Sequence, residues 1–191
     1  MSCELIVIGT SWGGLAALRR LLPGVPDELD VPIAIAQHRS ADSLAGGLEG
    51  LLQKVVDRRV REAADKDPIE RSHVYVAPPD YHLLVERGSF ALSTDERVQF
   101  ARPSIDVLFE SAADAYGESV VGVILTGANR DGAGGLRRIA DRGGVAIVQD
   151  PDTAEQREMP DAALEAADAT VLPLEEIGPH LATLCAAEVP T

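Results

Sequence analysis

The 191-residue sequence has few aromatic residues, few basic residues and only two cysteines. Aromatic residues make up 4% of a chain that is 46% hydrophobic, so we expect a core built mainly of valine, leucine, isoleucine and alanine. Only 17 lysines and arginines face 31 aspartates and glutamates, and the resulting charge of −14 argues against nucleic acid or an anionic membrane as partner. No apolar run approaches the ~18 residues of a membrane span, and the first residues do not show a basic n-region with a long apolar h-region. We therefore expect a cytoplasmic protein without membrane insertion.

The cysteines, Cys3 and Cys185, stand near opposite ends of the chain. They do not form a CxxC motif, so we expect both thiols to be reduced and structural. The close spacing expected of metal ligands is also missing among His73, His82 and His180. Either cysteine could instead be a nucleophile or half of a disulfide, and the sequence gives no indication of a metal centre.

Apolar strand-like and helix-like segments alternate along the chain, and the length suits one domain, here residues 1–191. This alternation predicts an α/β fold: a doubly wound, mostly parallel sheet with helices on both faces. Residues 81–85 and 90–92 are expected to add a small antiparallel hairpin. The other strands are predicted at 5–8, 31–36, 73–76, 120–125, 145–148 and around 171. Helices are predicted at 15–22, 44–56, 105–116, 136–141, 162–167 and near the C-terminus, the third of them capped by Ser104 and stopped at Gly117.

Three of the apolar segments lead almost directly into a polar side chain capable of chemistry. They are residues 5–8 before Ser11, 33–36 before His38 and 120–125 before Asp131. If these segments are parallel strands of one sheet, the three side chains emerge at its carboxyl edge, where open α/β sheets bind ligands. A hydroxyl, an imidazole and a carboxylate in one place are the parts of an activated nucleophile.

Ser11 lies in a glycine-rich turn that is expected to end a strand and begin a helix. The free N–H groups and positive dipole of that helix end suit a developing oxyanion, and the amide of Trp12 is the nearest candidate donor. The same geometry could instead hold a phosphate or another anion, or could be a structural turn only. The segment matches neither GxGxxG nor GxxxxGK[ST] and contains no lysine.

His38 and Asp131 also have ordinary structural interpretations. A single histidine is most often a plain polar residue, and an aspartate in a glycine turn is commonly a helix N-cap. In the functional interpretation the carboxylate of Asp131 accepts the imidazole N–H of His38 and fixes its tautomer. His82 is the next histidine to consider, although its position in the predicted hairpin favours packing or substrate contact.

The chain order Ser…His…Asp separates this sequence from one large class of serine enzymes. Residues 9–13 satisfy G-x-S-x-G in letters, as in the nucleophile elbow of α/β-hydrolases. In that class, however, the order is Ser…Asp…His, and the elbow lies in mid-domain rather than at residue 11. The α/β-hydrolases are therefore excluded.

The sequence resembles the catalytic domain of the CheB-type protein-glutamate methylesterases of bacterial chemotaxis over almost its whole length. Several motifs in the same order carry the resemblance: IGTSWGG at 8–14, QH at 37–38, VAPPDYHLL at 76–84, RPSIDVLF at 102–109, LTG at 125–127, DGA at 131–133, QD at 149–150 and MP at 159–160.

The resemblance implies a doubly wound α/β domain and a catalytic triad of Ser11, His38 and Asp131. It implies that Ser11 attacks the γ-methyl ester of a glutamate on a chemoreceptor, that methanol leaves, and that water releases the glutamate. Deamidation of glutamines by the same acyl-enzyme route is also implied, with no metal or organic cofactor. The implied partners are the methylated cytoplasmic helices of chemoreceptors or a related signalling protein, which makes the protein part of signal transduction.

The sequence departs from the family pattern at the rim of the expected site. Trp12 stands where serine or threonine is frequent, Ala128 where methionine is frequent, and Arg39 follows the histidine where Met-Pro is often found. Because the first predicted strand begins at residue 5, we expect no N-terminal receiver domain of the family and therefore no control by phosphorylation of this same chain. Arg39 and Arg130 each neighbour a triad residue, and we expect them to form a positive rim that guides a carboxylate-rich receptor helix, unless both are merely solvated surface charges.

Two other functions stay open from the sequence alone. The altered rim is compatible with a serine esterase or amidase that acts on a different acyl substrate. A non-catalytic binding module could keep the same fold and use the glycine turns to hold an anion or a partner. Hydrogen-bond distances from Ser11 to His38 and from His38 to Asp131 would favour catalysis, allowing for looser geometry without ligand.

Overall fold

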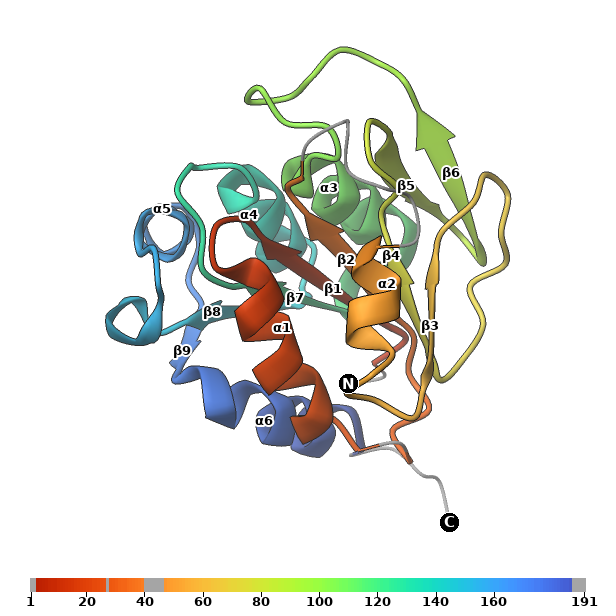
Figure 1. Cartoon of the computed structure of the whole chain (residues 1–191). Helices are drawn as coiled ribbons and strands as arrows, with labels where there is room; N and C mark the ends of the chain where they lie inside the picture. The colour runs from red at the N-terminus through yellow and green to blue at the C-terminus, as the bar shows by residue number, and fades with distance from the viewer. Residues whose placement is uncertain (1–2, 27, 40–46, 187–191) are drawn as a thin grey trace.

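The structure is a computed structural model that describes residues 3–26, 28–39 and 47–186 (Figure 1). Its strands are β1 (Leu5–Thr10), β2 (Ile33–Gln37), β3 (Arg59–Glu62), β4 (His73–Val76), β5 (His82–Glu86), β6 (Ser89–Ser93), β7 (Val120–Ile124), β8 (Val145–Gln149) and β9 (Thr170–Leu172). Its α-helices are α1 (Gly14–Leu21), α2 (Gly47–Leu52), α3 (Ile105–Tyr116), α4 (Ala133–Asp141), α5 (Glu158–Ala166) and α6 (Leu174–Ala186).

Seven of the strands form one parallel sheet in the order β3-β4-β2-β1-β7-β8-β9, and β5 and β6 pair as a separate antiparallel hairpin. The predicted fold class is therefore confirmed. Strand β1 is central, because Ile8 lies opposite Ile35 of β2 on one side and Val123 of β7 on the other. From β1 the chain passes to β2, β3 and β4 on one side of β1 and then to β7, β8 and β9 on the other, which makes the carboxyl end of β1 the point where the strand order reverses.

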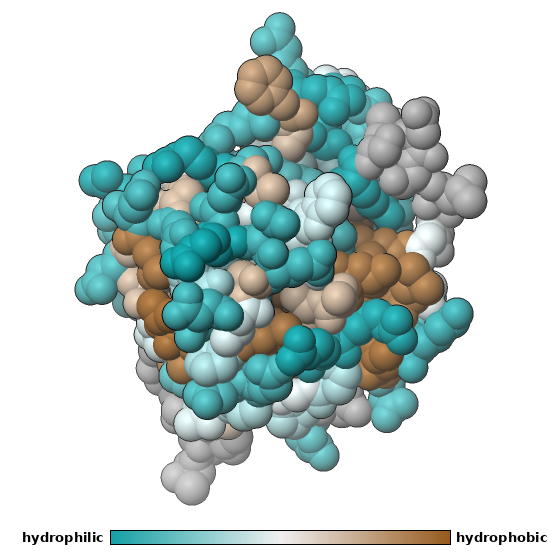
Figure 2. Space-filling view, turned by 60° about the vertical axis from the view of Figure 1, so that its left-hand side comes forward, coloured by the Kyte–Doolittle hydropathy of each residue, from teal (hydrophilic) through white to brown (hydrophobic). Residues whose placement is uncertain are grey.

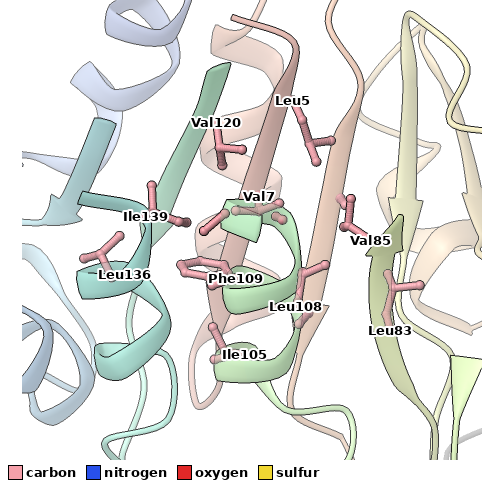
Figure 3. Packing of buried hydrophobic residues seen from close by; sticks show 14 of the residues in the cluster. Leu5, Val7, Leu83, Val85, Ile105, Leu108, Phe109, Val120, Leu136 and Ile139 are labelled. Carbon is pink, nitrogen blue, oxygen red and sulfur yellow. The ribbon is translucent and has the colours of Figure 1, made fainter. Parts of the chain in front are cut away.

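Each strand of the sheet centre is buried on both faces, as continuous apolar runs predict. In β1 the side chains of Leu5 and Val7 enter one core and those of Ile6 and Ile8 enter the other, because successive strand residues point to opposite faces. Helices α3 and α4 cover the first face, and Figure 3 shows α3 between β1 and the hairpin, with α4 beside β7. Helices α1, α2 and α6 cover the second face (Figure 1).

Most predicted elements are present with small changes of length. The strand at 73–76 has the predicted ends, the first hairpin strand is shifted by one residue to His82–Glu86, and the second is one residue longer at each end. Helix α5 begins at Glu158, earlier than predicted, because Pro160 falls within its first turn, where a proline costs little. The helix predicted at 44–56 covers only Gly47–Leu52, with residues 44–46 outside the described part.

Strand β3 was not predicted from the sequence. Its residues Arg59, Arg61 and Glu62 are charged, and only Val60 is buried. The strand lies at the edge of the sheet and pairs with β4 alone, so it needs little apolar character. Charged residues are common on such edge strands because they discourage pairing with other chains.

The two cysteines form a disulfide, so the expectation of reduced thiols was wrong. Cys3 precedes β1 and Cys185 lies in the last turn of α6, with their Cα atoms 5.1 Å apart. Both residues pack against the core that α1 and α6 share. A separation of 182 residues along the sequence gave no sign that the sheet and helix α6 would place them together.

The surface is largely hydrophilic, with brown apolar areas confined to patches on the face that Figure 2 presents. In the described part of the chain, no helix has the length and apolar character needed to cross a bilayer. The large hydrophobic side chains with substantial exposure include three aromatics, Trp12, Tyr81 and Phe100, in a chain that has only seven.

Candidate active site

The carboxyl ends of β1, β2 and β7 place Ser11 and His38 side by side. The main-chain N–H of His38 donates to the carbonyl of Thr10 at 3.0 Å, which continues the pairing of β2 with β1. The N–H of Ser11 donates to the carbonyl of Thr126 at 3.0 Å, which continues the pairing of β1 with β7. Both residues therefore begin the loops at the point where the strand order reverses.

His38 and Asp131 are joined by a short hydrogen bond between Nε2 and Oδ2 of 2.6 Å. The Asp131 side chain is completely buried and that of His38 is 12% exposed, so the pair is shielded from solvent. Because a carboxylate only accepts, the proton of the neutral imidazole lies on Nε2. The other ring nitrogen, Nδ1, is then the basic one.

Asp131 is held as an anion by several donors besides His38. Its Oδ1 accepts the Ser104 hydroxyl at 2.8 Å and the Asp106 amide at 3.1 Å, and its Oδ2 accepts the Ile105 amide at 2.7 Å. Burial alone would raise the pKa of Asp131, but the bonds from His38 and Ile105 outweigh it and lower the pKa below its usual value. The carboxylate is therefore charged at neutral pH.

Asp131 does not cap the helix that follows it. The N-cap of α4 is Gly132, at a φ of 99° that an L side chain rarely adopts, and it makes no side-chain cap bond. The carboxylate instead points to the N-terminus of α3, where the positive helix end favours an anion. The structural and catalytic interpretations of Asp131 are therefore compatible, because one carboxylate reaches both α3 and His38.

Ser11 occupies a tight turn between β1 and α1. Its carbonyl accepts the Gly14 amide at 3.0 Å, and Gly13 in between has a φ of 78°. Within the described residues the Ser11 hydroxyl makes no hydrogen bond, and the Trp12 amide likewise donates to no acceptor. A hydroxyl and a free N–H group are thus available at the end of β1.

Asn129 is a site residue that the sequence analysis missed. Its side-chain Nδ2 lies 3.3 Å from His38 Nδ1, and its Oδ1 accepts the Asp131 amide at 3.2 Å. The basic nitrogen of His38 is therefore in contact with Asn129 rather than with Ser11. Its position two residues before Asp131, in a glycine turn, was the only sequence signal.

Thr126, also missed, ties together the loops that surround Ser11. Its hydroxyl donates to the Trp12 carbonyl at 3.0 Å and accepts the Gln156 amide at 2.8 Å, while its own amide donates to Gln149 at 3.0 Å. The Thr10 hydroxyl in turn donates to the Thr126 carbonyl at 2.8 Å. These bonds fix the three loops relative to one another.

The predicted rim residues occupy different environments. The Trp12 side chain is 64% exposed and its indole N–H donates to Glu155 at 3.0 Å. Ala128 is exposed in the loop after β7. His82 is buried, and its Nδ1 accepts the Ser104 amide at 3.2 Å while Nε2 donates to the Glu96 carbonyl at 3.0 Å. His82 therefore holds the start of α3 and does not contact His38.

Neither expected rim arginine is a free positive charge. The Arg39 side chain is only 10% exposed and donates to Glu62 at 2.7 Å and to the Ala77 carbonyl at 3.1 Å. Arg130 is exposed but paired with Glu165 at 2.9 Å. The alternative of a solvated surface charge does not hold for Arg39, because the adjacent strand β3, which the sequence did not reveal, supplies Glu62.

A serine, a histidine and a buried carboxylate at the carboxyl edge of a doubly wound sheet are typical of serine hydrolases. The described residues contain no group of three histidine, cysteine, aspartate or glutamate side chains arranged to hold a metal ion.

Comparisons with a family model, with related sequences and with solved structures all indicate the same protein family. The family model described as CheB methylesterase matches residues 6–181. A protein of Leptospira interrogans is 50% identical over 179 residues, covering 93% of this chain and 92% of that protein. A protein of Anaeromyxobacter dehalogenans, named protein-glutamate methylesterase/protein-glutamine glutaminase 2, is 44% identical over 175 residues, which cover 91% of this chain but 51% of that protein.

The crystal structure of the Thermotoga maritima CheB methylesterase catalytic domain superposes with a TM-score of 0.89 at 32% sequence identity, over 96% of this chain and all of that one. The chain belongs to the CheB methylesterase family.

Proposed function

We propose that the chain is a protein-glutamate methylesterase in which Ser11 is the nucleophile, His38 the general base and Asp131 the residue that orients and stabilises the imidazole. The observation that carries this assignment is the 2.6 Å bond between His38 and the buried, ionised Asp131 at the strand end adjacent to Ser11. Family membership and the names of the relatives support the substrate class.

In the proposed reaction the Ser11 oxygen bonds to the carbonyl carbon of a glutamyl γ-methyl ester while its proton passes to His38 Nδ1. The tetrahedral intermediate then expels methoxide, which takes that proton and leaves as methanol. Water attacks the resulting acyl-enzyme with His38 again as base, and the free glutamate and the Ser11 hydroxyl are regenerated. Asp131 stabilises the imidazolium during both proton transfers.

The free amide of Trp12 is the proposed donor to the oxyanion. It follows the nucleophile directly and lies at the start of α1, where the helix dipole favours negative charge. A main-chain donor does not depend on the side chain, so the exchange of a hydroxyl residue for Trp12 keeps this function. Removing one such donor typically costs ~10²–10³ in rate.

The proposed substrate is a methylated helix of the cytoplasmic part of a chemoreceptor, which places the enzyme in the cytoplasm. Glutamine side chains would react by the same route, with ammonia leaving in place of methanol. The names of the relatives include both activities.

The test is release of methanol from methylated receptor by the wild type, Ser11→Ala and the control Ser89→Ala. Ser89 lies in the hairpin at β6, away from the strand ends. We expect Ser11→Ala to lose at least ~10³-fold in rate and Ser89→Ala to match the wild type. Equal activity of Ser11→Ala and wild type would contradict the assignment of Ser11 as the nucleophile.

Two other outcomes would change the proposed function. If the wild type is inactive on every receptor of its host but active on a small ester, a different acyl substrate is favoured. Inactivity on both would favour a binding module.

A further inference from the structure

A cavity of about 310 Å³ opens beside His38. His38 and Asn129 form one side of it, and residues of the segment between β6 and α3 form much of the rest. The described residues that line it are His38, Arg39, Arg97, Gln99, Phe100, Ala101, Arg102, Pro103 and Asn129. Any group bound in this cavity lies next to the proposed base.

The cavity has an excess of positive charge. Its described lining contains three arginines and no carboxylate. Arg39 is neutralised by Glu62, whereas Arg97 and Arg102 share a single oxygen of Asp80, at 3.1 and 2.8 Å. The three guanidinium groups are thus paired with only two carboxylates, which leaves one excess positive charge here in a chain whose net charge is −14.

Arg97 and Arg102 differ in how much of their hydrogen-bonding capacity is used. Arg102 is 17% exposed and also donates to the carbonyls of Thr94 and Asp95 at 2.7 and 3.0 Å, so it is a structural residue. Arg97 is 48% exposed and, among the described residues, makes one hydrogen bond, to Asp80. Its remaining N–H groups are available to a ligand, and a guanidinium binds carboxylates with directed, charge-assisted bonds.

The segment that carries Arg97 is fixed in a conformation that exposes an aromatic ring. Val98 and Ala101 bond each other's main chains, and the Gln99 side chain donates to Asp106 at 2.8 Å. Gln99 and Phe100 both have positive φ, 47° and 66°, and Phe100 is 96% exposed. Two left-handed residues without glycine, together with an exposed phenyl group, are costly for stability, which favours a binding function for the segment.

We propose that this cavity binds a carboxylate-bearing side chain of the polypeptide substrate that lies next to the glutamyl methyl ester, with Arg97 as the anion-binding residue and Phe100 packing on the aliphatic stem. This inference rests on the proposed function, since it concerns specificity at the same site. The positive group that recognises acidic substrate is then Arg97, and not Arg39 or Arg130.

The test uses two peptides of equal length, each with one glutamyl γ-methyl ester, flanked by glutamates in one and by glutamines in the other. Methanol release is measured for the wild type, Arg97→Gln, Phe100→Ala and the control Arg137→Gln, whose exposed side chain lies on α4. We expect the wild type to prefer the acidic peptide by about tenfold in kcat/KM. Arg97→Gln should lower kcat/KM for the acidic peptide to about the value for the neutral peptide. Phe100→Ala should lower kcat/KM for both peptides. Arg137→Gln should leave kcat/KM for both at the wild-type value.

Binding of the same peptides, fluorescently labelled, to Ser11→Ala and to Ser11→Ala with Arg97→Gln separates failure of this inference from failure of the proposed function. Tighter binding of the acidic peptide that disappears with Arg97→Gln supports the cavity assignment even if no methanol is released. Equal binding and equal hydrolysis of the two peptides would overturn the cavity assignment and leave the methylesterase activity standing.

Discussion

The carboxylates of Asp106 and Asp131 each cap the helix that belongs to the other. Asp131 precedes α4 but accepts the Ile105 amide at the start of α3 at 2.7 Å. Asp106 lies in α3 but accepts the amides of Gly132 and Gly135 at the start of α4, at 3.0 and 2.7 Å. The exchange fixes α3 against α4 and thereby fixes the carboxylate that orients His38.

Asp131→Asn should lower kcat on methylated receptor by roughly 10³–10⁴-fold, the loss expected when the orienting carboxylate of a triad is removed. Asparagine has one accepting oxygen: an NH₂ group in the place of Oδ2 loses the bonds from both Ile105 and His38, and an NH₂ group in the place of Oδ1 loses the bond from the Asp106 amide. We also expect about 1–3 kcal/mol less free energy of unfolding, measured by urea denaturation. A variant as active as the wild type would show that His38 needs no carboxylate.

Asp106→Asn should change how stability depends on pH. Burial raises the pKa of Asp106, the Gly135 amide opposes the rise, and the negative charge of Asp131 adds to it. In the folded state Asp106 therefore holds its proton above the usual value of 3.8, so the stability it confers declines as the pH rises from 3.8 through its folded pKa.

The asparagine variant lacks this decline. Relative to the wild type it should gain unfolding free energy between acidic and neutral pH, as urea titrations at constant ionic strength would show. Asp131, whose pKa is lowered, acts in the opposite direction: its contribution is complete above 3.8 and is lost as the pH falls through its folded pKa. A difference between Asp106→Asn and wild type that is independent of pH would contradict the assignment.

Asn129→Ala should expose the basic nitrogen of His38. Asn129 Nδ2 lies 3.3 Å from Nδ1, and in the proposed mechanism it must move before Nδ1 takes the Ser11 proton. One neutral hydrogen bond is worth about 1 kcal/mol, so we expect a small fluorophosphonate to label Ser11 up to about fivefold faster in the variant. Labelling at the wild-type rate or below would mean that Asn129 does not restrain His38.

Reduction of the disulfide should destabilise the fold without changing the chemistry. Cys3 and Cys185 join the two ends of the described chain, and the bond restricts the unfolded state over nearly its whole length. The variant with both Cys3→Ser and Cys185→Ser should lose about 2–4 kcal/mol of unfolding free energy. Activity below the unfolding transition should stay at the wild-type level, because Cys3 lies before β1 and Ser11 lies after it. Equal stability with and without reductant would contradict the cross-link.

The sequence predicted the centre of the sheet and the three strand-end residues, because the strands before Ser11, His38 and Asp131 are buried on both faces and are therefore continuously apolar. It could not predict features that depend on contact between distant segments. The ion pair of Arg39 needs Glu62 on an edge strand with almost no apolar signal, and the disulfide needs two chain ends to meet.

Only one of the contacts of Asp131, the one with His38, could be predicted from the sequence. Its proximity to His38 followed from strand order, whereas its bonds to Ser104 and Ile105 depend on how closely α3 approaches β1. Gly9 permits that approach, since a Cβ there would lie 2.2 Å from the Ile105 side chain. The site of Arg97 and Phe100 was missed because its loop has no periodic pattern.

The double use of Asp131 has a consequence for how this protein could diverge. A descendant that abandoned catalysis could replace Ser11 at little structural cost, because the hydroxyl bonds to nothing in the described chain. Replacing Asp131 would leave the buried N-terminus of α3 without its anion. Selection for folding alone would therefore preserve the aspartate after activity had gone. Among relatives with this sheet, the residue at the end of the first strand is thus the better marker of a working enzyme than the acid that assists it.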